Sequence, residues 1–154
     1  MTNYNTVLDF FDLCIEHYSE LLSFENEKLR LISAENAREL GNRLSKEQAL
    51  IMKGNALEAK RIELMKKEGL EGLRFDAIIE NAPDEYNTAL SRRRDELTKY
   101  INEIKRINGH AMVSVREKLE RIEKVKAGMS TDIYDGKGEK KHSASASSSL
   151  SKNV

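Results

Sequence analysis

The stretch "LTKYINEIKRINGHAMVSVREKLERIEKVK", Leu97 to Lys126, decides the fold. Its apolar residues recur mostly three, four or seven positions apart, a spacing that places them on one face of an α-helix. The pattern extends back to Pro83, so the predicted helix of some 40 residues is about 60 Å long at 1.5 Å per residue. An average step near 3.5 indicates packing against a neighbouring helix in the manner of a coiled coil. The residues in register are Leu90, Leu97, Ile101, Ile104, Ile107, Ala111, Val115, Leu119, Ile122 and Val125.

Two further helical segments precede it, over residues 6–33 and 35–68, and the apolar pattern of the second is the weaker one. The first has a broad apolar face, and Thr6 with Asp9 three positions later resembles a capping box at its start. Ser33 either ends this helix or caps the next one, so one long kinked helix and two separate helices are both allowed. In the second segment Gly41 and Gly54 each cost about 1 kcal/mol relative to alanine, and the glycines of "EGLEG" end it.

The connection to the long helix contains apolar residues that can pack on the other helices, and it ends with residues typical of the start of a helix. Its apolar residues predict that the connection folds back onto the helices: Leu73, Phe75, Ile78 and Ile79. Pro83 with the acidic residues Asp84 and Glu85 marks the start of a helix near residue 83, which continues to about 127. Gly109, in the middle of that helix, indicates a soft point or a close contact with another helix.

These elements predict an all-α fold: an elongated antiparallel helical hairpin or three-helix coiled-coil-like bundle over residues 1–129. Residues 130–154 are rich in Lys and Ser and offer little apolar surface to bury, so we expect a flexible tail there.

The composition of the chain supports an elongated helical protein and narrows the function classes. Lys and Arg balance Asp and Glu at 26 each, which gives no net charge for nucleic acid or an acidic membrane. Aromatic residues make up only 6 % of the 154 residues, and Trp is absent. The single cysteine, Cys14, cannot form an internal disulfide, and no signal segment or apolar run of about 20 residues is present. We expect a reduced, cytoplasmic protein without direct membrane insertion.

Motifs for catalysis, cofactors or metals are missing from the sequence. There is no phosphate-binding glycine loop, Cys-x-x-Cys pair or His-Glu-x-x-His. Cys14 and His17 share a helix face, where a metal or thiol site would begin, but ordinary packing is the alternative that we favour. The arginines of "SRRRDE" point in three directions from a helix, which favours a salt-bridged solvated face over phosphate contacts. We therefore expect no enzyme, no cofactor, no metal and no nucleic acid.

The last third of the long helix carries the candidate binding site. It extends beyond the predicted helices that would cover it, and an exposed apolar stripe with methionines is typical of an adaptable protein-binding surface. Packing inside the protein and self-association are the alternatives. The stripe consists of Met112, Val115, Leu119, Ile122, Val125 and Met129.

Three segments of the chain resemble the FlgN family of flagellar export chaperones. They are "SKEQALIM" from Ser45, the regular helix "INEIKRINGHAMVSVREKLERIEKV" from Ile101, and the closing "YDGKG" from Tyr134. The resemblance covers roughly residues 6–138. It implies a cytoplasmic, non-enzymatic chaperone that binds helical terminal segments of hook–filament junction (hook-associated) proteins through its last amphipathic helix and delivers them to the export gate.

Tyr134 lies among turn-forming residues just after that helix. A local contact with Met129 or Ile133 is one interpretation. The other is an aromatic anchor for a second partner, because a rigid aromatic ring gives a large contact area at a small entropy cost. With the family resemblance, this second partner would be the export gate. A structural coiled-coil adaptor that self-associates, for instance as a homodimer, is the competing function.

Overall fold

The computed structural model describes residues 1–129, and within them the chain forms five helices and no strands. The helices are α1 (Tyr4–Ser33), α2 (Ala37–Asn42), α3 (Leu44–Lys67), α4 (Phe75–Asn81) and α5 (Asp84–Met129). The all-α prediction is confirmed. The predicted tail over residues 130–154 lies outside the described residues.

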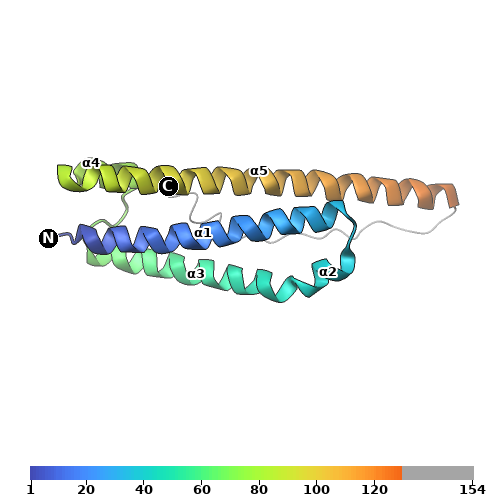
Figure 1. The fold of residues 1–154 in the computed structure, drawn as a ribbon, viewed down its shortest axis with the longest axis horizontal. Helices are drawn as coiled ribbons and strands as arrows, with labels where there is room; N and C mark the ends of the chain where they lie inside the picture. The colour runs from blue at the N-terminus through green and yellow to red at the C-terminus, as the bar shows by residue number, and fades with distance from the viewer. Residues whose placement is uncertain (130–154) are drawn as a thin grey trace.

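Helix α1 is the central element, flanked by α3 on one side and α5 on the other (Figure 1). It begins at Tyr4 because the side-chain oxygen of Asn3 accepts a hydrogen bond from the backbone N–H of Thr6 at 3.2 Å. The predicted capping box at Thr6 was therefore wrong, and the helix starts two residues earlier than expected. Val7, Phe11 and Tyr18 of α1 are buried in the main apolar core.

Helix α1 ends at Ser33 and α2 begins at Ala37, so this part of the chain forms two separate helices and not one long kinked helix. The N–H of Asn36 bonds to the carbonyl of Leu31, and the N–H of Glu35 bonds to that of Ile32, each at 3.0 Å. This is a Schellman motif, and its left-handed position is occupied by Glu35 with φ 55° instead of a glycine. Asn36, and not Ser33, then caps α2 by accepting a hydrogen bond from the N–H of Glu39.

The predicted helix over residues 35–68 is interrupted at Arg43, between α2 and α3. Gly41 weakens the helix nearby, and two ion pairs turn the following segment toward α1. Arg43 contacts Glu27 at 3.1 Å, and Glu47 contacts Lys28 at 2.9 Å. Gly54, by contrast, is buried within the continuous helix α3.

Helix α3 runs antiparallel to α1 and ends as predicted. Lys53 lies near Glu20 at 3.6 Å, and the backbone carbonyl of Glu68 accepts a hydrogen bond from Thr2 at 2.8 Å, so the end of α3 lies beside the start of α1. Gly69 takes φ 74° just after the helix, which is the left-handed C-terminal position that glycine adopts at low cost.

The connection that follows contains a short helix, α4, which the sequence did not predict. Its anchors pack as expected, since Phe75 stacks on Phe11 with ring centroids 4.0 Å apart and Ile78 is also buried. Pro83 immediately precedes α5, which starts at Asp84, one residue later than predicted. Gly109 lies within the uninterrupted α5 and no atom approaches within 4 Å of where its Cβ would be, so neither a soft point in the form of a helix break nor a close helix contact is found there.

Helix α5 runs parallel to α1 along the whole length of α1 and continues past the C-terminal end of α1 (Figure 1). Arg93 binds Asp12, 81 residues away, and further along Lys118 donates to the backbone carbonyl of Ile32, 86 residues away. This nearly constant separation fixes the parallel register. The buried residues of α5 extend from Leu90 to Ile107, and no described side chain after Ile107 is buried.

Candidate functional site

The apolar stripe at the end of α5 is exposed, as the sequence predicted. The exposed fractions of its described side chains lie between 39 % and 61 %, although the apolar residues earlier on the same helix, from Leu90 to Ile107, are buried. Met129 ends α5, but its side chain is outside the description. The exposed members are Met112, Val115, Leu119, Ile122 and Val125.

Four of these side chains line a groove of about 770 Å³ between the end of α5 and the turn that links α1 to α2. The groove residues of α5 are Val115, Leu119, Ile122 and Val125. Met112 is exposed but does not line it. The opposite wall is also apolar and comes from the end of α1 and from α2, through Ile32, Ala37 and Leu40.

Sequence reasoning missed this opposite wall. Ala37 and Leu40 fall within the predicted helix over residues 35–68, whereas in the structure they lie in a six-residue helix with no buried residue. The signal was present in the local sequence, because Asn36 is a helix cap immediately before Ala37 and Gly41 lies shortly after Leu40. A helix this short cannot bury its own apolar side chains. They must either pack against a neighbouring element or stay exposed to solvent.

Polar contacts attach the end of α5 to the turn. The Lys118 ammonium donates to the carbonyl of Ile32 at the C-terminal end of α1, where a cation is favourable because the last carbonyls of a helix carry partial negative charge. Lys118 and Arg121 also lie 3.7 and 3.8 Å from the same carboxylate oxygen of Glu35. These contacts join α5 to the turn beside the groove and leave the apolar floor of the groove open.

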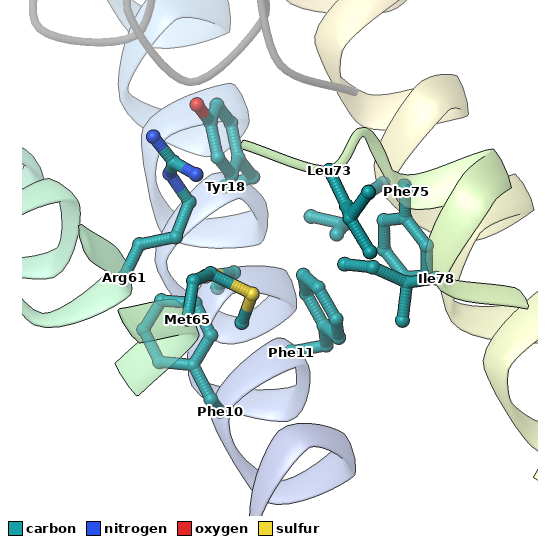
Figure 2. Close-up of a pocket in the computed structure, with 10 residues that line it drawn as sticks. Phe10, Phe11, Tyr18, Arg61, Met65, Leu73, Phe75 and Ile78 are labelled. Carbon is teal, nitrogen blue, oxygen red and sulfur yellow. The ribbon is translucent and has the colours of Figure 1, made fainter. Parts of the chain in front are cut away.

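A second, much smaller space lies inside the core between α1, α3 and α4, and Figure 2 shows the side chains around it. Its volume of about 30 Å³ has room for one or two water molecules. The walls are mostly apolar, with Phe11, Met65 and Phe75 among them. This space is a packing defect of the core and is too small for an organic ligand.

Cys14 lines that internal space, and its thiol has low reactivity. Burial raises the pKa of its thiol to about 12, with a further contribution from the negative charge of Glu58. A thiol with such a pKa is protonated at neutral pH and is a poor nucleophile or metal ligand. Within residues 1–129 no group of three or more His, Cys, Asp or Glu side chains is arranged to hold a metal ion.

His17, the neighbour of Cys14 in the sequence-based hypothesis, is a buried residue of the contact between α1 and α3. Burial lowers the pKa of its imidazole, and the positive charge of Lys53 lowers it further. Its Nδ1 atom is buried without a hydrogen-bond partner. The neutral ring packs edge-on against Tyr18, with centroids 5.6 Å apart.

Two of the three consecutive arginines form ion pairs, as expected for a salt-bridged face. Arg93 makes two hydrogen bonds to the Asp12 carboxylate, at 2.8 and 3.0 Å, and links α5 to α1. Arg94 binds Asp76 of α4 at 2.9 Å. These guanidinium groups hold helices together.

The long helix with its open groove defines an all-α module that has one apolar surface uncovered. Consistent with this, the model of the FlgN protein family matches residues 1–140, which is most of the chain. The chain belongs to the FlgN family, whose members are flagellar export chaperones and not enzymes. Searches of curated proteins and of solved structures gave no match. In the part of the chain that the structure describes, every helix is too short or too polar to span a bilayer.

Proposed function

We propose that the groove binds helical terminal segments of hook–filament junction proteins before their export. The observation that carries the proposal is the row of four exposed apolar side chains on α5, which faces a second apolar wall across the groove. An amphipathic helix laid in such a groove buries its apolar face by the same contacts that a third neighbouring helix would make. Family membership supplies the class of client.

Covering the client segment would act as the chaperone step. The terminal helices of such clients would otherwise associate with one another, and binding keeps them soluble and unassembled by mass action. The step requires no nucleotide. We place it in the cytoplasm, with release at the export gate.

The test replaces two groove residues by aspartate. Leu119→Asp with Ile122→Asp introduces two charges into the apolar floor, which would have to be desolvated when a client helix binds. The matched control is Met52→Asp with Ile62→Asp, two exposed apolar residues of α3 that do not line the groove. We expect the groove variant to lose co-purification of hook–filament junction proteins from the native cell, while the control variant retains it.

Helical content measured by circular dichroism should be nearly unchanged in both variants, because all four side chains are exposed. If the folded groove variant still captures these proteins, the groove is not the client site.

We further propose that Tyr134, outside the described residues, docks on the export gate. Tyr134→Ala should then leave client binding intact and weaken binding to the isolated gate protein, and Tyr134→Phe should retain most of it. Equal gate binding by the wild-type and Ala proteins would contradict the docking role.

A self-associating adaptor is the second candidate function, and the same exposed stripe favours it because a second copy could cover it. Analytical ultracentrifugation separates the two functions. A stable dimer that dissociates when Leu119 and Ile122 become aspartate would mean that the groove is a homodimer interface. A monomer, or a dimer that the substitutions do not affect, leaves the groove available for a client.

A further inference from the structure

The polar residues of the groove carry a positive charge. Lys118, Arg121 and Lys126 line it, and Glu35 is the one acidic residue among its lining residues. The whole chain, by contrast, is balanced at 26 basic and 26 acidic residues. The excess is therefore a local property of this surface.

Helix α5 contributes basic but no acidic side chains to the groove. Its acidic residues in this part, Glu117, Glu120 and Glu123, are exposed but do not line the groove. Arg116 and Lys124 also lie outside the lining, so the groove side differs from the rest of this surface in having no carboxylate from α5. An arrangement made for solubility alone would not need to keep carboxylates off the groove side.

Glu35 shows what kind of group the two cations at the groove edge accept. Its carboxylate lies 3.7 Å from Lys118 and 3.8 Å from Arg121, and Glu35 remains 63 % exposed. Ion pairs of this length and exposure contribute little free energy, so an incoming carboxylate can replace them at small cost. Glu35 also has a left-handed backbone conformation, with φ 55°, which is unfavourable for a residue other than glycine.

We infer that the occupant of the groove is an amphipathic helix with Asp or Glu residues along one edge of its apolar face, which take the place of Glu35 at Lys118 and Arg121. This inference rests on the proposed function and specifies the chemical class of client segment. Apolar contacts with the floor supply affinity, whereas the carboxylates select the client and its orientation, because opposite charges at an interface rim mainly determine specificity.

Two synthetic helical peptides test the inference. Both carry the same apolar face, and the positions along its edge are Glu in one peptide and Lys in the other. Fluorescence anisotropy with the full chain should give about tenfold tighter binding of the Glu peptide in about 50 mM salt, from two exposed pairs that change from attraction to repulsion. At about 0.5 M salt the ratio should fall toward about twofold, since exposed charges are then screened.

Charge reversal in the protein identifies the groove cations. Arg121→Glu should lower the preference for the Glu peptide to about twofold or reverse it. The matched control Lys124→Glu makes the same change three residues later on the same helix, at an exposed position that does not line the groove, and should leave the preference intact. Glu35→Gln should tighten binding of the Glu peptide by removing its intramolecular competitor.

The outcomes separate this inference from the proposed function. Both peptides could bind equally well and lose binding when Leu119 and Ile122 become aspartate. This result would overturn the inference that the client helix is acidic along one edge, but it would support binding of a helix in the groove. Binding of neither peptide would overturn both proposals. Equal effects of Arg121→Glu and Lys124→Glu would show a general charge effect and would also overturn the inference.

Discussion

Two isoleucines of the same helix provide the sharpest test of the open groove. Ile107 is 0 % exposed, whereas Ile122, fifteen positions later, is 50 % exposed. Both lie within the uninterrupted helix α5, so the change to alanine alters helix propensity equally at the two sites. The difference between Ile107→Ala and Ile122→Ala therefore measures the difference in burial.

The expected magnitudes follow from these exposures. Ile107→Ala removes a fully buried side chain and leaves a cavity, which costs about 2–4 kcal/mol of the free energy of unfolding. Ile122→Ala loses at most about half of the 1.5–3 kcal/mol that burial of such a side chain contributes. Alanine then returns about 0.4 kcal/mol through its higher helix propensity. The net cost at Ile122 should stay below about 1 kcal/mol.

Urea unfolding followed by circular dichroism measures both variants. We expect a clear fall of the midpoint for Ile107→Ala and a small one for Ile122→Ala, with similar m-values, because a change in m would indicate a different unfolded or native state. The measurement should be repeated at two protein concentrations. If Ile122→Ala costs as much as Ile107→Ala, the stripe is already covered in the free protein, and the open groove is refuted.

Three further predictions concern other parts of the molecule. Glu35→Gly should be more stable than Glu35→Ala by about 1 kcal/mol in urea unfolding, because only glycine relieves the left-handed backbone conformation while both lose the ion pairs; equal stabilities would mean that the turn is unstrained. His17 has a pKa lowered from 6.5 in the folded state, so the unfolded chain takes up its proton first and stability should fall as the pH drops through 6.5. His17→Leu should remove this part of the pH dependence, and an unchanged profile would contradict it. Cys14, with a pKa of about 12, should react with a thiol-specific dye at least about 100-fold more slowly in the folded protein than in urea, and similar rates would contradict its burial.

Features that depend on local physics could be predicted from the sequence. Gly69 ends α3 because the left-handed conformation is inexpensive for glycine, and Pro83 precedes α5 because it pre-forms a helix start. The periodicity of α5 likewise identified its core face. The error at Thr6 was also local. Asn3 is an equally good helix cap, and it needs no partner three residues later.

Tertiary contacts decided the features that the sequence did not predict. The break at Arg43 depends on ion pairs with α1 that involve Glu27 and Lys28, and periodicity cannot detect partners so far away in the chain. The short helix α4 exists because Phe75 and Ile78 are held against α1 and α5. A seven-residue helix is unstable alone, so its propensity gave no clear signal.

The exposure of the stripe, which the sequence predicted, results from the register between α1 and α5, and the apolar periodicity alone does not determine that register. Helix α1 has 30 residues and α5 has 46, about 45 and 69 Å at 1.5 Å per residue. Because Tyr4 and Tyr86 pack together with ring centroids 5.2 Å apart, both helices start level and all the excess length of α5 lies at its C-terminal end. The turn at Glu35 then brings α2 beside that end, so the excess forms one wall of a groove. If the ends of α1 and α5 were level instead, the same residues would be core, with no change in their pattern.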